Sequence, residues 1–344
     1  MKTKKMNYAN LNNSKFVNVS KTVLTLLLVA IFGLTSCKSD ENDQEGQDPD
    51  GAALGQMFQD NRTNNTQTFM IDASTGGTVT GSQGTQVTFP ANSIGLNGVA
   101  VTGNVDIELV EVYDRASMLL NNMPTSGKKP NGDEEALKSA GEYFINATQN
   151  GTDLDLLAPA QVQSRGVGSN VPEAMNIFRA GDNVEDLDLW EEADEDGDGI
   201  TDVGGMGERE TANGFEFFYL FDISSFGWAN LDRWYNYTGA LTDISIDVPD
   251  VFHGTNCEVY LTYDGEPTAL ARMDIYDAQT GLFTEHYGRI PVGQEVHIIL
   301  VAEIGGVLHS TIQGTTIVDN HVETMAYPQA TTQAALTTAI NGLP

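Results

Sequence analysis

The sequence predicts an all-β protein of two β-sandwich-type domains, with an export leader and acidic tether before them and a short C-terminal helix after them. Three observations support this prediction. From residue 67 onward, short runs rich in Val, Ile, Thr, Phe and Tyr alternate with clusters of Gly, Asn and Asp. Signals for long helices are scarce, and 40% of the 344 residues are hydrophobic, which suffices for buried cores. Many short strands joined by Gly-rich turns are typical of sandwiches or barrels rather than of α/β enzymes.

The first 36 residues have the pattern of an export leader. Met1–Lys21 contains five lysines and no acid, and the apolar run Val23–Phe32 follows it. This run is too short for a membrane span, which needs about 20 apolar residues, but it suits the core of a signal peptide. It ends in Leu34-Thr35-Ser36-Cys37, which resembles the lipobox of bacterial lipoproteins. The resemblance implies cleavage before Cys37, which would then carry diacylglycerol and a fatty acid such as palmitate. The alternative is an ordinary secretory signal with an incidental cysteine.

Residues 37–55 are expected to form a flexible acidic tether. Lys38–Ala52 has six acids, one lysine and no large apolar side chain, so it has nothing to bury. An acidic cluster directly after a lipidated cysteine also resembles the surface-export signal of lipoproteins in the Bacteroidota. That resemblance implies a protein anchored in the outer membrane and facing the cell exterior. A plain spacer is the alternative interpretation.

The charge balance restricts the partners. The chain has 48 acidic and 17 basic side chains, a formal net charge of −31, and loss of the leader would make it −36. Binding to phosphate backbones requires clustered Lys and Arg, so a nucleic acid partner is not expected. Docking on an anionic lipid surface through charge is disfavoured for the same reason. The expected contact with the membrane is therefore the N-terminal lipid anchor.

The first domain is expected at 56–163. In Asn104–Val112, Val105, Ile107 and Leu109 share one face, and the opposite face begins with polar residues, as in a half-buried strand. A short helix is expected at Arg115–Asn121. The other strands predicted in this domain are Thr68–Asp72, Gly77–Gly81, Thr85–Phe89, Tyr143–Thr148 and Leu154–Leu157.

Three segments of this domain resemble the ZU-five domain, a β-domain shared by zonula occludens proteins, netrin receptors and ankyrins. They are Gly76–Val79, Gln86–Ser93 and Val105–Leu109. One departure from the family pattern is that Ala91 follows Pro90 directly. The resemblance implies a module that binds other proteins. Some members cleave themselves at His-Phe-Ser, a tripeptide absent from this chain, so self-cleavage is not expected.

The second domain is expected at 164–327, followed by a helical tail at 328–344. Its predicted strands are Phe215–Ile223, Ile244–Val248, Glu258–Tyr263, Ala269–Ile275, Glu295–Ala302, Leu308–Gln313 and Val322–Ala326. The stretch after Phe226 resembles a Gly-Trp-x-Asn-x-Asp-Arg stretch in Bacteroidota lipoproteins. It supplies a possible binding surface, because Trp and Arg are frequent at interface hot spots. The residues concerned are Trp228, Asn230, Asp232, Arg233 and Trp234. The alternative is a structural corner that pins a loop to the core.

An acidic insertion near 182–210 contains the sharpest local motif. Its spacing of oxygen ligands, with Gly199 permitting a tight curl, matches most of a calcium loop. The bidentate Glu of an EF-hand is missing, because Gly205 occupies that position, and the segment looks more like a thrombospondin type 3 repeat. The expected Ca²⁺ ligands are Asp194, Asp196, Asp198, the carbonyl of Ile200, and Asp202. The alternative is a solvated hairpin tip that binds no ion.

The motifs of the common enzyme classes do not stand out. The sequence contains no Gly-x-Ser-x-Gly elbow and no phosphate-cradling glycine loop, and no catalytic residues are predicted. Paired carboxylates for glycoside hydrolysis remain open, because a chain so rich in acids offers many pairs. The leading hypothesis is a non-catalytic binding or scaffold protein of the cell envelope, whose ligand is an envelope protein or a glycan. The alternative is a glycan-binding or glycan-hydrolysing accessory protein of a nutrient-uptake system.

Overall fold

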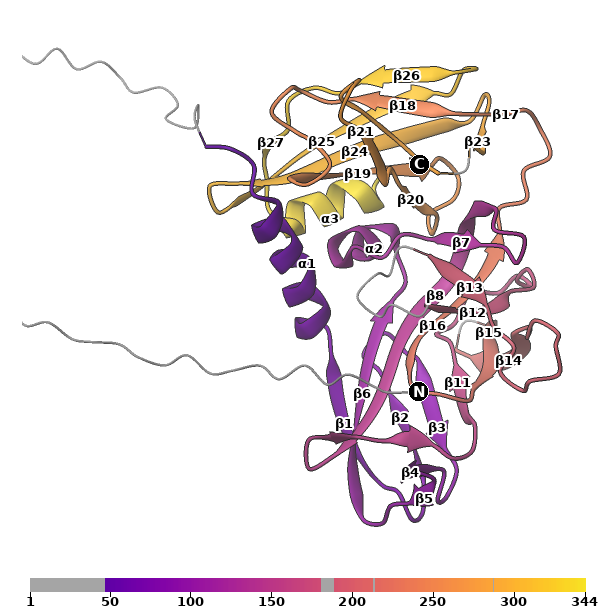
Figure 1. Cartoon of the computed structure of the whole chain (residues 1–344). Helices are drawn as coiled ribbons and strands as arrows, with labels where there is room; N and C mark the ends of the chain where they lie inside the picture. The colour runs from indigo at the N-terminus through magenta and orange to yellow at the C-terminus, as the bar shows by residue number, and fades with distance from the viewer. Residues whose placement is uncertain (1–46, 181–188, 213, 287) are drawn as a thin grey trace, which may run out of the picture. The chain divides into compact units, whose positions relative to one another are not determined.

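The computed structural model in Figure 1 describes residues 47–180, 189–212, 214–286 and 288–344. Strands account for 49% of it and helices for 10%, so the prediction of an all-β fold is confirmed. The described residues all belong to one compact unit. The expected signal peptide, Cys37 and the first part of the expected tether lie outside the described residues. Within the described ranges, no helix has the length and apolar character needed to cross a membrane.

The first sandwich consists of an eight-stranded and a five-stranded sheet, with a small three-stranded sheet beside them. The eight-stranded sheet contains β1 (Gln67–Asp72), β6 (Asn104–Val112), β7 (Ser126–Lys128), β8 (Glu134–Gln149), β9 (Thr152–Asp153), β12 (Asn176–Ala180), β13 (Trp190–Glu192) and β16 (Gly227–Trp234). The five-stranded sheet contains β2 (Gly77–Thr80), β3 (Gln86–Phe89), β11 (Ala160–Gln163), β14 (Gly205–Thr211) and β15 (Gly214–Ile223). The small sheet contains β4 (Ile94–Leu96), β5 (Val99–Ala100) and β10 (Asp155–Leu156).

The core of this sandwich follows from the alternation of apolar residues. In β6, Val105, Ile107 and Leu109 are buried in one apolar cluster with residues of the five-stranded sheet, as the pattern predicts. Strand β3 ends directly before Pro90, which has no N–H to donate to a neighbouring strand. The turn before β2 uses Gly76 at φ +69°, where a Cβ atom would lie 2.2 Å from the carbonyl oxygen of Phe89.

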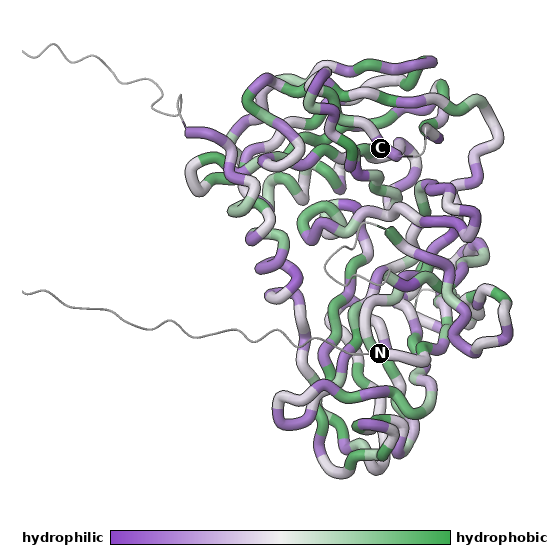
Figure 2. Tube along the Cα trace, viewed as in Figure 1, coloured by the Kyte–Doolittle hydropathy of each residue, from purple (hydrophilic) through white to green (hydrophobic). Residues whose placement is uncertain are grey.

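The second sandwich is built from a five-stranded and a four-stranded sheet. The five-stranded sheet contains β19 (Cys257–Tyr263), β20 (Leu270–Arg272), β24 (Glu295–Ile304), β25 (Val307–Thr316) and β27 (Gln329–Ala330). The four-stranded sheet contains β18 (Ile244–Asp247), β21 (Ile275–Asp277), β22 (Leu282–Thr284) and β26 (His321–Thr324). A two-stranded sheet pairs β17 (Leu241–Thr242) with β23 (Ile290–Pro291). Figure 2 shows apolar residues along strands of both sandwiches, while many of the connecting loops are hydrophilic.

Each sandwich has its own apolar cluster, and the helices contribute to a further one where the two sandwiches meet (Figure 1). They are α1 (Gly51–Asn64), α2 (Arg115–Asn121) and α3 (Gln333–Asn341), and the last two confirm the predicted helices. The cluster joins residues from all three helices with Trp228 of β16, Tyr260 of β19 and Ile299 of β24. The buried Arg115 donates hydrogen bonds to the backbone oxygen of Ile340, in the last turn of α3, and to those of Leu343 and Pro344 after the helix.

The sheets do not divide at the predicted domain boundary between residues 163 and 164. Strand β8 pairs with β16, and β11 pairs with β15, so strands from both sides of that boundary share each large sheet. The sheets instead change between Trp234, the end of β16, and Leu241, the start of β17. The difference has a physical reason, because strand partners that are far apart in the chain leave no local pattern at the point where a domain ends.

The end of the expected tether is ordered rather than flexible. Asp50 caps α1 by accepting hydrogen bonds from the backbone N–H groups of Ala52 and Ala53, both at 3.0 Å. Leu54 and Phe58 are buried against the other two helices and the second sandwich. The tether prediction failed here because it weighed composition alone, whereas Asp50 starts a helix with two large apolar residues on one face.

Candidate functional site

The acidic motif forms an exposed loop between β13 and β14. Asp194, Asp196 and Asp202 each present one carboxylate oxygen, and these oxygens all lie within 4.8 Å of one another. This triad could hold a metal ion, and it is the only such group of His, Cys, Asp and Glu side chains among the described residues. The structure therefore brings together three of the five ligands predicted from the sequence.

Backbone hydrogen bonds shape this loop around its carboxylates. Asp194 accepts from the N–H groups of Gly197, Asp198 and Gly199, at 2.7 to 3.0 Å. Asp202 accepts from the N–H of Glu195 at 2.5 Å. The chain thus curls around Asp194, as the spacing of acids and glycines predicts.

One further expected ligand, Asp198, stands apart from the triad. Asp198 is outside the group of converging carboxylates, and it accepts a hydrogen bond from the N–H of Ile200 at 2.8 Å. The side chain of Ile200 is exposed. Asp186 and Asp188, two further acids of the same insertion, lie outside the described residues.

A contact at its base fixes the loop to the sandwich. The Glu195 carboxylate binds Arg179 of β12 and accepts a hydrogen bond from the N–H of Ser224 at 2.7 Å. Burial alone would raise the pKa of Glu195, but the contacts with Arg179 and Ser224 outweigh it and the pKa is lowered. Glu195 is therefore engaged with the sandwich and is not part of the triad.

The Trp228–Trp234 stretch is a central strand of the eight-stranded sheet, not an exposed surface. Strand β16, to which it belongs, pairs with β8 on one side and β12 on the other. Asn230 and Asp232 are fully buried, and Trp228 is only 8% exposed. Three of the five residues of the predicted binding surface are thus buried, and Arg233 and Trp234 are half-buried. The stretch forms a strand with a β-bulge between Asn230 and Asp232, not a corner, and binding at its two half-buried residues stays a prediction.

This strand brings two buried carboxyl groups into one polar cluster. Glu142 of β8 pairs with Asn230, and the side-chain amide of Asn230 donates to Asp232 at 2.7 Å. Ser139 completes the cluster by donating to the Asn230 Oδ1 at 3.0 Å. Neither carboxylate oxygen of Glu142 has a hydrogen-bond partner within the described part of the chain, and the same holds for Oδ1 of Asp232.

Burial controls the protonation of these two acids. Loss of solvation raises the pKa of Asp232 to about 8, against the opposing hydrogen bonds from Ser139 and Asn230. Burial and the nearby Asp232 carboxylate raise the pKa of Glu142 well above its ordinary value. A cavity of about 460 Å³ is lined by Ser139 but not by either carboxyl group. Both carboxyl groups are therefore buried and lie outside the lining of this cavity.

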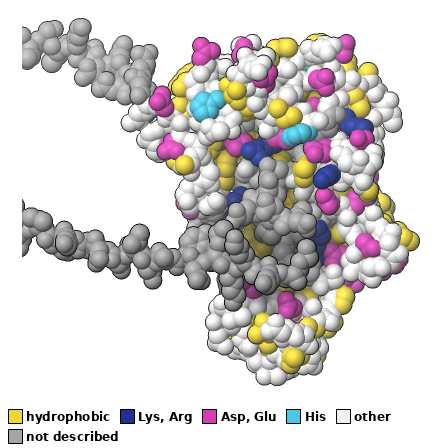
Figure 3. Space-filling model, viewed as in Figure 1, with side chains coloured by type: hydrophobic (Ala, Val, Ile, Leu, Met, Phe, Trp, Pro, Cys, Tyr) yellow, Lys and Arg dark blue, Asp and Glu magenta, His cyan; other side chains and the backbone are white. Residues whose placement is uncertain are grey.

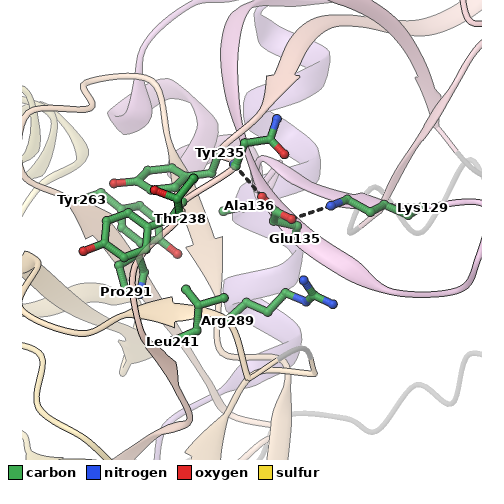
Figure 4. Close-up of a pocket in the computed structure, with 11 residues that line it drawn as sticks. Lys129, Glu135, Ala136, Tyr235, Thr238, Leu241, Tyr263, Arg289 and Pro291 are labelled. Carbon is green, nitrogen blue, oxygen red and sulfur yellow. Dashed lines mark hydrogen bonds and ion pairs between the residues drawn. The ribbon is translucent and has the colours of Figure 1, made fainter.

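A second pocket lies where the chain passes from the first sandwich to the second (Figure 4). It has a volume of about 290 Å³, and its walls include Tyr235 and Tyr237 of the connecting segment, Tyr263 of β19 and Arg289 beside β23. Asn236 adopts a left-handed backbone conformation at φ +50°, which turns the chain between the first two tyrosines. The N–H of Asn236 donates to Glu135 at 2.6 Å and fixes this turn to β8.

The tyrosine rings form a connected wall. The ring centroids of Tyr235 and Tyr263 are 5.1 Å apart, and those of Tyr235 and Tyr237 are 6.3 Å apart. Tyr263 is buried, Tyr235 is half-buried, and Tyr237 is 39% exposed, so the wall extends from the core to the surface. Lys138 lies over the Tyr235 ring, with its Nζ 4.3 Å from the centroid.

The charged groups at this pocket are paired with one another. Lys129 and Glu135 form an ion pair at 2.5 Å, and Arg289 contacts the Asp133 carboxylate at 2.7 Å. Figure 4 shows the Lys129–Glu135 pair at one side of the pocket and Arg289 below it. Each of the two cations that line the pocket is thus paired with a carboxylate, although Asp133 itself does not line the pocket.

Cys257, the one cysteine in the described residues, has the properties of a core residue. It is 3% exposed, and burial raises the pKa of its thiol to about 12. Because the thiolate is the nucleophilic form, a thiol with this pKa is unreactive at neutral pH.

No protein-family model matches this chain, and no match to it is found among curated proteins. The resemblances to the ZU-five domain and to thrombospondin type 3 repeats therefore stay predictions.

Sequence reasoning missed both the tyrosine pocket and the buried acid pair. The pocket combines residues 129, 135, 235, 263 and 289, which are too far apart for a spacing pattern to reveal. A weak signal was present in Trp234–Tyr237, where three aromatic residues fall within four positions. For the acid pair, the signal was a glutamate directly before the apolar run Tyr143–Ile145 in a strand.

Proposed function

We propose that this chain is an outer-membrane lipoprotein, anchored through Cys37 and facing the cell exterior, which acts as a non-catalytic binding or scaffold protein with a calcium-stabilised loop. The observation that carries this proposal is the convergence of Asp194, Asp196 and Asp202. Calcium loops of extracellular modules bind at about 10⁻⁴–10⁻³ M, which is useful only where calcium is abundant. Such a loop is consistent with the export pattern of residues 1–37.

The physical case for calcium rests on charge and ligand chemistry. Three carboxylate oxygens held so close together repel one another, and a divalent cation offsets this repulsion. Calcium prefers six to eight oxygen ligands in a flexible arrangement, which an exposed loop with free carbonyl groups and water can supply. Because Gly205 stands where an EF-hand has a bidentate Glu, we expect weak affinity.

Calorimetry with the purified protein tests the loop. We expect calcium to bind with a Kd of about 10⁻⁴–10⁻³ M, and Asp196→Asn to weaken binding at least tenfold, because it removes one converging carboxylate. Asp222→Asn is the matched control, since Asp222 is an exposed acid on β15 outside the triad. Absence of heat with millimolar calcium, or equal heat from the Asp196→Asn protein, contradicts the calcium assignment.

The lipid anchor has a separate test in cells. We expect radiolabelled palmitate to be incorporated into the wild-type protein and not into Cys37→Ser, which lacks the acylated thiol. Protease added to intact cells should then degrade the wild-type protein, because the proposal places it on the outer face. A wild-type protein without label overturns the anchor, and a labelled protein that resists the protease on intact cells but not on lysed cells overturns the surface location.

A second candidate function, a glycan-binding accessory protein of a nutrient-uptake system, is favoured by the tyrosine pocket. Tyrosine rings present a flat apolar face together with a polar hydroxyl, a combination suited to sugar rings. The hydrolytic form of this function receives less support. Glu142 and Asp232, the acids with the most strongly raised pKa values, are fully buried and do not line the pocket.

A further inference from the structure

We propose that the pocket of Tyr235, Tyr237 and Tyr263 binds one uncharged sugar ring at the end of a glycan. This inference rests on the proposed binding function and names its ligand class. The size of the pocket, about 290 Å³, lies at the lower limit of ligand pockets, which occupy about 300–1,000 Å³. A single ring with part of its neighbour fits this volume better than a long chain does.

The aromatic wall accounts for the apolar face of such a ligand. A pyranose ring presents several axial C–H groups on one side, and these pack against the electron-rich face of an aromatic ring. Tyr237 is the residue best placed for this contact, because 39% of its surface is exposed while Tyr235 and Tyr263 support it from behind. Lys138 already covers part of Tyr235, which leaves Tyr237 as the accessible platform.

The pairing of both cations at the pocket disfavours a strongly charged ligand. Lys129 is paired with Glu135, and Arg289 is paired with Asp133. An acidic sugar would have to compete with the two carboxylates for the cations, and an amino sugar would have to compete with the cations for the carboxylates. A neutral sugar does not disturb either pair, because its hydroxyl groups both donate and accept hydrogen bonds.

Polar groups at the pocket can form hydrogen bonds with the hydroxyl groups of a sugar. The Tyr237 hydroxyl is 3.5 Å from the carbonyl oxygen of Val292, and the Tyr235 hydroxyl is 3.4 Å from Gln294, both at the weak limit of a hydrogen bond. The exposed Thr238 adds another hydroxyl to the wall. The guanidinium of Arg289 lines the pocket and offers N–H donors that a sugar hydroxyl can share with Asp133.

The test uses saturation-transfer NMR and calorimetry on the full chain after leader removal. The neutral probes are maltose, cellobiose, xylobiose and mannobiose, and the charged probes are glucuronic acid and glucosamine. We expect at least one neutral disaccharide to bind at concentrations up to about 10 mM and to bind more tightly than either charged sugar. Tyr237→Ala should weaken that binding about tenfold, and Tyr237→Phe should retain it within about threefold, because the ring supplies the contact.

Tyr327→Ala is the control, because Tyr327 is 48% exposed and does not line the pocket. The inference is overturned if no neutral disaccharide binds, if a charged sugar binds more tightly, or if Tyr237→Ala binds as the wild type does. These failures leave the calcium titration and the palmitate label unaffected, so they are distinguishable from failure of the proposed function. Unchanged thermal unfolding of Tyr237→Ala shows that any lost binding is local.

Discussion

Glu142 and Asp232 place two carboxyl groups in a solvent-inaccessible part of the sheet, where burial raises the pKa of each and so favours its protonated form. An isolated charge in such a site costs several kcal/mol, so the neutral acid is the stable form over a wide pH range. Raised pKa values of this kind often mark catalytic groups. Here the aromatic residues Phe144, Phe178 and Trp228 share the cluster that covers this face of the sheet, and the pair serves the structure of β8 and β16.

Because these buried acids have raised pKa values, we expect the free energy of unfolding to decrease as pH rises. The folded-state pKa of Asp232, about 8, lies above its unfolded value, so its contribution is fully present below pH 3.8 and is lost as pH rises through 8. Between pH 5 and 7 we expect Asp232 to contribute a decrease of up to about 1.4 kcal/mol per pH unit to the free energy of unfolding, measured by urea denaturation without calcium. Asp232→Asn should flatten this slope, whereas the exposed Asp222→Asn should not. An identical slope in wild type and Asp232→Asn contradicts the prediction.

At the scale of elements, the sequence predicted those strands that have a clear local pattern of apolar residues. The strands β6, β15, β19 and β24 appear where alternating or continuous apolar runs place them. By contrast, β16 was interpreted as a surface or a corner, because its Asn, Asp and Arg residues resemble a turn. The residues opposite Asn230 and Asp232 in the sheet, Glu142 and Ser139, come from β8, some 90 positions earlier in the chain. The tyrosine pocket was missed for the same reason, whereas the acidic triad was found because its three carboxylates lie within nine residues.

At the scale of the whole molecule, strand pairing crosses the position at which the sequence suggests a domain boundary. A fragment of residues 47–163 would lack β16, the long partner of β8, and β15, the partner of β11. We expect this fragment to show no cooperative unfolding transition by circular dichroism and little protection from hydrogen exchange, because two long sheet edges are exposed. The chain 47–344 should unfold cooperatively in the same assays. Cooperative unfolding of the short fragment would show that 163 is a real boundary.

The net negative charge is also a property of the whole molecule. On the face shown in Figure 3, acidic side chains are spread over the surface and are not gathered in one basin. A surface of this kind keeps the protein soluble and repels nucleic acid and anionic lipid without defining a binding site. The sugar binding proposed above is assigned to the tyrosine pocket, where Lys129 and Arg289 are each paired with a carboxylate.

The junction before α1 determines which part of the molecule bears mechanical load. Pro49 forms a β-bridge with Ile304, and the N–H of Asp50 donates to the carbonyl oxygen of Glu303 at 2.8 Å. Although β1 belongs to the first sandwich, the chain that precedes it is fastened to the end of β24 in the second. A force applied from the N-terminal side therefore acts first on the contact with the β24–β25 hairpin and on the buried side chains of Leu54 and Phe58. We expect the force to reach β1 only after α1 has separated from the second sandwich.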